Sequence, residues 1–170
     1  MTFLADYIIQ KHVPVGQNPE LPAFRGNVGI TQGWISIFTN LLLFVVKLFF
    51  GFISNSIALI ADAFHTLADM ASSAVVVFGF KMASKPADRE HPFGHGRAET
   101  IAALTISILI GFTGIEFIKS SIARFMEDIM INVNWAVIAV IILTIFLKEG
   151  LARLSLNLGD RINSDILKAD

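Results

Sequence analysis

Residues 34–53 have the sequence WISIFTNLLLFVVKLFFGFI, residues 57–82 have the sequence IALIADAFHTLADMASSAVVVFGFKM, and only the turn SNS separates them. Each stretch is long enough to cross the hydrocarbon core of a bilayer as an α-helix, which takes about 20 mostly apolar residues. Only Asn40 and Lys47 place strongly polar side chains in the first stretch. The two stretches together predict a hairpin of two transmembrane helices.

The composition of the whole chain agrees with this prediction. Of its 170 residues, 54% are hydrophobic and 16% are charged, whereas an average soluble domain has about 25% charged residues. The chain has no cysteine, so disulfides and thiolate metal sites are excluded and any metal ligands must be histidine or carboxylate side chains. The formal net charge is −1 and no basic stripe is present, so we expect no nucleic-acid partner. The N-terminus does not have the pattern of a removable signal peptide.

Two more apolar segments, at about 100–118 and 134–147, extend the predicted bundle. A further helix is expected to begin at about Ser164, a residue type that is favoured at the N-cap. The sequence therefore predicts an all-α membrane protein, a helical bundle with four complete transmembrane helices and the start of a fifth. We expect this bundle to occupy 33–170 and to follow a cytoplasmic lead-in over 1–32, which contains three of the five prolines.

Lysine and arginine residues indicate the orientation, because cytoplasmic loops carry an excess of them. The turn after the first predicted span has none. They gather before the first span, around the loop at 83–97 and after the fourth span, at Lys11, Arg25, Lys81, Lys85, Arg89, Arg97, Lys148, Arg153, Arg161 and Lys168. We therefore expect a multi-pass protein of the plasma (inner) membrane whose N-terminus is cytoplasmic.

An internal similarity connects the predicted hairpin with the end of the chain. Residues 55–62, NSIALIAD, match residues 163–170, NSDILKAD, at the Asn, Ser, Leu, Ala and Asp positions. Both segments lie where a helix is predicted to begin, and repeated helices often build the binding sites of transporters. We interpret the last helix as a second copy of the start of the second span.

Three ionisable residues lie on one face of the second predicted span. Asp62, His65 and Asp69 are separated by offsets of three and seven, which places them on one stripe of a helix. A charged group at the centre of a bilayer costs about 2.5–3.5 kcal/mol on insertion scales, so this stripe needs a polar partner, a cavity or a bound ion. Imidazole and carboxylate are common zinc ligands, which makes these three residues a candidate metal site. The alternative is that they pair with Lys47 or with polar atoms of adjacent helices, and Asp62 is close enough to the helix start to serve the helix dipole instead.

A second candidate metal site lies in the polar loop. Asp88, His91 and His95 offer one carboxylate and two imidazoles in a turn-rich segment, although a solvated loop is the alternative interpretation. Asn40 and Lys47 are seven residues apart on the first span, and we interpret them as polar contacts into the interior of the bundle.

Residues 54–69, SNSIALIADAFHTLAD, and 86–99, PADREHPFGHGRAE, resemble the cation diffusion facilitators, which are proton-coupled exporters of zinc and related divalent metals. The resemblance implies a six-helix transporter, usually a homodimer with a cytoplasmic metal-binding domain after the last helix. It implies a transport site with two ligands from the second helix, matching His65 and Asp69, and two from a His-x-x-x-Asp on the fifth. The loop site of some members matches Asp88, His91 and His95.

The resemblance also implies residues beyond this sequence, because the repeat predicts a histidine three residues after Asp170. We therefore interpret 33–170 as part of a cation-efflux transmembrane domain. We expect zinc export across the bilayer in exchange for protons, with Co²⁺, Fe²⁺, Mn²⁺ or Cd²⁺ as alternative ions because these ligands suit several of them. His65 would couple the two ions, since a metal needs neutral imidazole and acid protonates an ordinary imidazole at about pH 6.5.

Two other functions fit parts of the pattern. A non-transporting partner or assembly subunit could use the same fold to bind a full-length relative. An intramembrane metalloenzyme is disfavoured because no nucleophile or third strong ligand accompanies His65 and Asp69, and we expect no enzymatic activity.

The orientation can be tested by cysteine labelling, because the chain has no cysteine of its own. In Lys85→Cys the new thiol is expected to react with a membrane-impermeant maleimide from the cytoplasmic side, and in Ser54→Cys from the opposite side. Labelling of both variants from one side would contradict the predicted orientation.

Overall fold

A computed structural model describes residues 2–12, 22–125 and 135–170. Every regular element in these ranges is a helix, and none of the described residues forms a strand. In chain order the helices are α1 (Thr2–His12), α2 (Pro22–Ile53), α3 (Ile57–Ala83), α4 (Arg97–Phe125), α5 (Trp135–Arg161) and α6 (Asp165–Ala169). The prediction of an all-α protein is confirmed.

Three helices are long and apolar enough to cross a membrane, with candidate spans at Phe24–Ile53, Ile57–Ala83 and Arg97–Ala123. They correspond to the first three predicted spans. The fourth predicted span, 134–147, begins at a residue outside the described ranges and otherwise lies in α5, which is not one of these candidates. Four complete transmembrane helices therefore remain a prediction.

Helix α2 begins earlier in the chain than the apolar pattern indicated. We expected a lead-in up to residue 32, but α2 already begins at Pro22 and α1 precedes it. Proline is tolerated in the first turn of a helix, because the N–H that it lacks would have no partner there. Pro22 therefore starts α2 inside the segment that we expected to be a lead-in.

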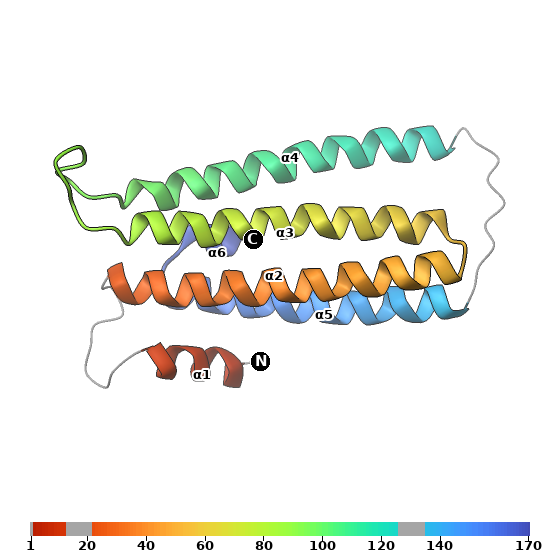
Figure 1. Cartoon of the computed structure of the whole chain (residues 1–170), viewed down its shortest axis with the longest axis horizontal. Helices are drawn as coiled ribbons and strands as arrows, with labels where there is room; N and C mark the ends of the chain where they lie inside the picture. Colours follow the sequence, from red (N-terminus) through yellow and green to blue (C-terminus); the bar gives the residue numbers. More distant parts are fainter. Residues whose placement is uncertain (1, 13–21, 126–134) are drawn as a thin grey trace.

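The long helices lie side by side, with α3 packed between α2 and α4, and α5 against the other side of α2 (Figure 1). The start of α2, the loop after α3 and the end of α5 lie at one end of the bundle, and the turn between α2 and α3 lies at the other (Figure 1). Short helix α1 contacts α2 and α5, and α6 contacts α4 and α5. This arrangement puts Lys85 and Ser54 at opposite ends, as the predicted topology requires.

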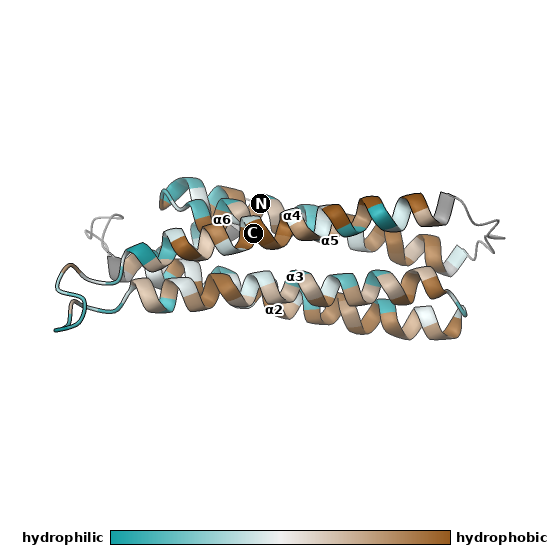
Figure 2. Cartoon of the chain, turned by 90° about the horizontal axis from the view of Figure 1, so that it is seen from above, coloured by the Kyte–Doolittle hydropathy of each residue, from teal (hydrophilic) through white to brown (hydrophobic). Residues whose placement is uncertain are grey.

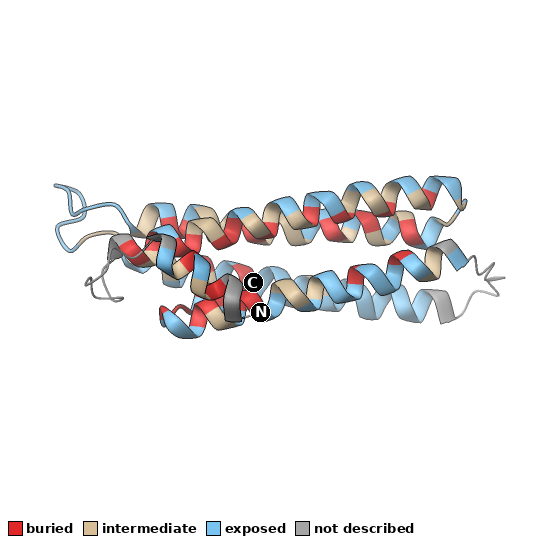
Figure 3. Cartoon of the chain, turned by 90° about the horizontal axis from the view of Figure 1, so that it is seen from below, coloured by how far each residue is buried: buried red, intermediate tan, exposed pale blue. Residues whose placement is uncertain are grey.

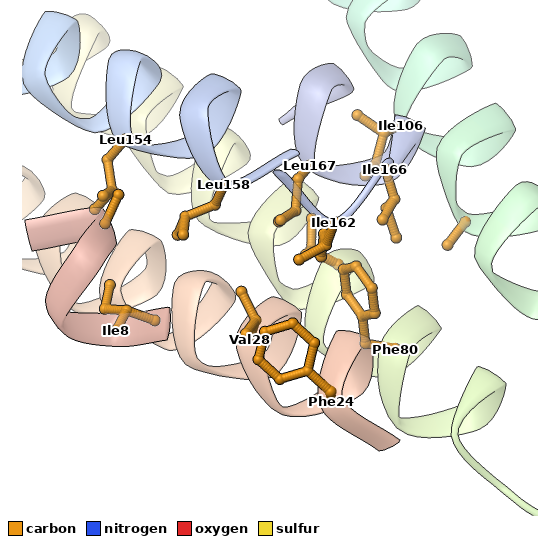
Figure 4. Close-up of a cluster of buried hydrophobic side chains, with 13 residues drawn as sticks. Ile8, Phe24, Val28, Phe80, Ile106, Leu154, Leu158, Ile162, Ile166 and Leu167 are labelled. Atoms are coloured by element: carbon orange, nitrogen blue, oxygen red, sulfur yellow. The ribbon is translucent and has the colours of Figure 1, made fainter. Parts of the chain in front are cut away.

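A buried apolar core lies at the end of the bundle that contains α1 and α6 (Figure 4). It joins all six helices, through residues such as Ile8, Phe24, Phe80, Ile106, Leu158 and Ile166. Towards the other end, burial is confined to the facing sides of neighbouring helices (Figure 3). Their outer surfaces are mostly apolar, whereas polar residues gather at the loop end (Figure 2). An apolar outer surface fits a lipid environment.

The turn between α2 and α3 has the hydrogen bonds of a Schellman motif. The Ser56 N–H donates to the carbonyl of Gly51 at 2.9 Å, and the Asn55 N–H donates to the carbonyl of Phe52 at 3.2 Å. Asn55 has φ of 47°, the left-handed conformation that this motif requires. Ser56 then caps α3 by accepting a hydrogen bond from the Leu59 N–H at 3.3 Å. This turn fixes where α3 begins.

The turn between α5 and α6 repeats this geometry. The Ser164 N–H donates to the carbonyl of Gly159 at 2.8 Å, and the Asn163 N–H donates to the carbonyl of Asp160 at 3.4 Å. Asn163 has φ of 49°, and Ser164 is the N-cap of α6, as predicted. The internal similarity therefore extends to backbone structure. Because the two turns lie at opposite ends of the bundle, the second hairpin is inverted relative to the first (Figure 1).

Helices α3 and α4 approach closely at Gly79. A Cβ atom there would lie 2.5 Å from the Cβ of Ala102 and 2.9 Å from the Cδ1 of Ile166. Gly111 offers a matched control, because a Cβ atom there would meet nothing within 4 Å. Valine at position 79 would force α4 and α6 away from α3.

We predict that Gly79→Val destabilises the folded protein by about 1–3 kcal/mol, the usual cost of overpacking, whereas Gly111→Val has a much smaller effect. Thermal unfolding in detergent, followed by circular dichroism, measures both. Equal shifts of the two melting temperatures would contradict the close approach at Gly79.

Candidate functional site

Helix α3 presents His65 and Asp69 one turn apart. His65 Nε2 lies 3.8 Å from Asp69 Oδ1, and the two side chains are 27% and 34% exposed. Both line a cavity of about 390 Å³ between α3 and α4. The ring of Phe117 holds the imidazole on its α4 side, edge to face at a centroid distance of 4.8 Å. An imidazole and a carboxylate that share a cavity can bind one metal ion together.

Asp62 is directed elsewhere. Its carboxylate lies 2.9 Å from Lys47 Nζ, and this lysine also donates a hydrogen bond to Thr66 Oγ1 at 2.8 Å. Lys47 is only 2% exposed, so the ion pair neutralises a charge inside the bundle. The structure thus pairs Asp62 with Lys47, as the alternative interpretation of these residues expected, although Asp62 also lines a cavity with His65.

Asp69 also has a partner on α5. Lys148 Nζ donates a hydrogen bond to Asp69 Oδ2 at 2.5 Å. The pattern of lysine and arginine residues placed Lys148 among the charges after the fourth predicted span and so missed this contact. Helix α5 continues without interruption to Arg161, which carries Lys148 into the bundle. The sequence also indicated an amphipathic extension of the fourth span through Leu158, which agrees with α5 but does not show which residue Lys148 contacts.

Two further cavities adjoin the one that His65 and Asp69 share. A cavity of about 330 Å³ is also lined by His65, together with Asp62 and Glu116. Another cavity, of about 240 Å³, is also lined by Asp69, together with Asp170. The two candidate ligands therefore lie where three cavities adjoin along the bundle.

The loop brings together the three residues of the second candidate site. Their ligand atoms all lie within 4.8 Å of one another, and no other trio of His or carboxylate residues in the described ranges does so. Asp88 Oδ1 lies 3.4 Å from His91 Nδ1, and Asp88 Oδ2 lies 3.6 Å from His95 Nε2. His95 Nδ1 is buried without a hydrogen-bond partner among the described residues. The loop thus has the donors and the spacing for one small cation.

Backbone hydrogen bonds hold the Asp88 carboxylate in place. Its Oδ1 accepts from the N–H of His91 at 2.6 Å and from the N–H of Glu90 at 3.0 Å. The hydrogen bond from the His91 N–H lowers the pKa of Asp88, because it stabilises the charged form. The carboxylate therefore stays ionised at lower pH than an ordinary aspartate and remains available as a ligand. Gly94 closes the loop with a φ of 79°, which a side chain would oppose.

Residues 33–170 match the family described as the cation efflux transmembrane domain. The chain belongs to the cation diffusion facilitator family. An uncharacterized transporter of Methanocaldococcus jannaschii is 39% identical to it over 136 residues, which are 80% of this chain and 48% of that protein. The manganese efflux system protein MneP of Bacillus subtilis is 33% identical over 135 residues, 79% of this chain and 45% of that protein.

A third relative matches a shorter part. The magnetosome protein MamM of Paramagnetospirillum magneticum is 45% identical over 83 residues, 48% of this chain and 26% of that protein. The chain spans about half the length of the first two relatives. No solved structure matches it significantly. Family membership and three apolar helices identify a multi-pass membrane protein of a transporter family, not of an enzyme family.

We predict that the loop binds one Zn²⁺ ion, and that His91→Ala weakens this binding by about tenfold or more because one of three ligands is lost. Glu90→Ala is the matched control, since its side chain is outside the trio. Calorimetric titration in a background with Asp69→Ala isolates the loop.

The pH dependence has a defined sign. Zinc binding is expected to weaken as the pH falls, because protons compete with the metal for histidine ligands, and Asp88 contributes little to this loss because its lowered pKa keeps it ionised. Equal affinity of the wild-type chain and His91→Ala would show that the loop is only solvated.

Proposed function

We propose that the complete protein exports a divalent metal ion, zinc in the first instance, across the membrane in exchange for protons. One observation supports the proposal: His65 and Asp69 share a cavity inside the bundle, and each of them also lines a second cavity that adjoins it. A carrier needs a central site of this kind that can be exposed to either side in turn. Membership of a cation efflux family supports the same activity.

The remaining ligands would come from the continuation of α6. Zinc prefers four ligands, and His65 with Asp69 provides two of them. Asp170 on α6 already lines a cavity with Asp69, so a longer α6 would run past the site. The His-x-x-x-Asp that the family resemblance implies on this helix would supply the other two. His65, Asp69 and this helix form the proposed transport site. We do not include Asp62 among its metal ligands, because Asp62 forms an ion pair with Lys47.

The choice of zinc rests on the imidazole. A nitrogen ligand suits zinc better than manganese, which prefers carboxylate and carbonyl oxygens. MneP is named as a manganese efflux protein, so its similarity favours manganese as the second candidate. Binding of a metal by His65 requires neutral imidazole and therefore releases any proton that it carries, which provides the link to proton exchange.

The setting of this activity is part of the proposal. We propose that α5 crosses the bilayer as the fourth complete transmembrane helix, that the N-terminus is cytoplasmic, and that the protein works in the plasma (inner) membrane as a homodimer. The loop at Asp88, His91 and His95 would then bind metal on the cytoplasmic side. Their proximity supports this role.

We predict that His65→Ala and Asp69→Ala each abolish zinc uptake into everted membrane vesicles that contain the complete protein, because each removes a ligand from the central site. Ser72→Ala is a matched control on the same helix and the same cavity, and it is expected to transport normally. Membrane insertion should persist in all variants, since loss of a polar group from a span makes insertion easier.

His65→Asp is the sharper variant. It keeps a ligand but replaces nitrogen with oxygen, so transport is expected to shift from zinc towards manganese. Transport at the parent rate in both alanine variants would overturn the site. A wild-type protein that inserts and binds zinc but moves none would instead indicate a non-transporting partner.

A further inference from the structure

In the ion pair between Lys148 and Asp69, the positively charged side chain of the protein occupies a carboxylate that the transported ion would need. We propose that Lys148 is an internal competitor of the metal: it occupies Asp69 in the metal-free state and moves to Asp170 when the metal binds. This inference rests on the proposed transport site. It adds Lys148 on α5 as a residue that lowers the affinity of the site for its metal ion.

The competition follows from the shared ligand atom. Lys148 Nζ is hydrogen-bonded to Asp69 Oδ2, and these side chains are 37% and 34% exposed. A zinc ion bound to the same carboxylate would lie about 2.0–2.2 Å from one of its oxygens. A divalent ion and an ammonium group on one carboxylate repel each other because they carry like charges a few ångströms apart. Metal binding therefore requires that the ammonium group leaves.

The same cavity offers the ammonium group a second carboxylate. Lys148, Asp69 and Asp170 all line the cavity of about 240 Å³. Asp170 accepts hydrogen bonds from Ser36 at 3.1 Å and from Ser73 at 3.0 Å, and these hydroxyls hold it in place opposite α5. A lysine has a flexible four-carbon stem. Its charge can thus pass from Asp69 to Asp170 without leaving the cavity.

The other lysine inside the bundle shows what a purely structural ion pair looks like here. Lys47 is 2% exposed, and it has both Asp62 and Thr66 as partners. Lys148 is hydrogen-bonded to one described residue, and it faces an open cavity. Of these two lysines, Lys148 is the one that can be displaced. A competing charge weakens the site, and a carrier benefits because its ion must leave as well as enter.

Removal of the charge provides the first test. In the complete protein, Lys148→Met is expected to bind Zn²⁺ about tenfold more tightly than wild type, because the metal no longer displaces an ammonium group. Lys148→Arg retains the charge, so this variant is expected to bind Zn²⁺ about as weakly as wild type does. A lysine with a structural role alone predicts equal or weaker binding in Lys148→Met, and either of these results would overturn the proposal.

Chemical modification separates charge from side-chain loss within one polypeptide. Residues 1–170 contain no cysteine, so Lys148→Cys provides a single thiol in a complete protein whose other cysteines are replaced by serine. Modification with 2-aminoethyl methanethiosulfonate restores an ammonium group, whereas methyl methanethiosulfonate leaves a neutral side chain and also removes the thiol as a metal ligand. The neutral adduct is expected to bind zinc more tightly than the charged one. Equal affinities of the two adducts would overturn the proposal.

A double-mutant cycle tests the transfer to Asp170. Asp170→Asn removes the second carboxylate, so it is expected to weaken zinc binding several-fold when Lys148 is present and to have no effect in Lys148→Met. An equal effect in both backgrounds would overturn the transfer. Adding Asp69→Ala to Lys148→Met in a His91→Ala background, which lacks one loop ligand, separates the two proposals. Tight zinc binding that survives it would refute the proposed transport site itself, whereas loss of binding leaves only the role of Lys148 under test.

Discussion

Charge neutralisation inside an apolar bundle is the constraint on which the rest of this structure depends. A lone charge at the centre of a bilayer is costly, so each ionisable side chain on α3 must find a partner. Lys47 provides one for Asp62 and Lys148 provides one for Asp69. The first pair ties α3 to α2 and the second ties α3 to α5. The register of three helices is therefore linked to the same groups that form the candidate site.

The long apolar segments were enough to predict the first three spans, because a hydrophobic run of about 20 residues leaves few alternatives to a helix. They misplaced the start of α2, since Pro22 can begin a helix as readily as it can interrupt one. The spacing of His65 and Asp69 predicted their proximity. The pairing of Asp69 with Lys148 could not be predicted, because it joins residues from different helices whose packing no local pattern encodes.

In the loop at 83–97, by contrast, contacts between residues that are close in sequence determine the candidate site. There, Asp88 and His91 are three residues apart and the His91 N–H donates to the Asp88 carboxylate, so the sequence spacing alone anticipated the cluster. Local hydrogen bonds at the turn residue Asp88 make this possible, as they do in many Asx turns. The family match adds what neither spacing nor packing contains: this chain spans about half the length of the relatives that it matches.

The two matching Asn-Ser turns have a consequence for how the chain is divided into helices. Each turn ends one helix at a left-handed asparagine and starts the next at the following serine. The two turns stand at opposite ends of the bundle. The same short pattern therefore sets a helix boundary at both ends, and a substitution at Asn55 or Asn163 would alter one boundary and leave the other intact.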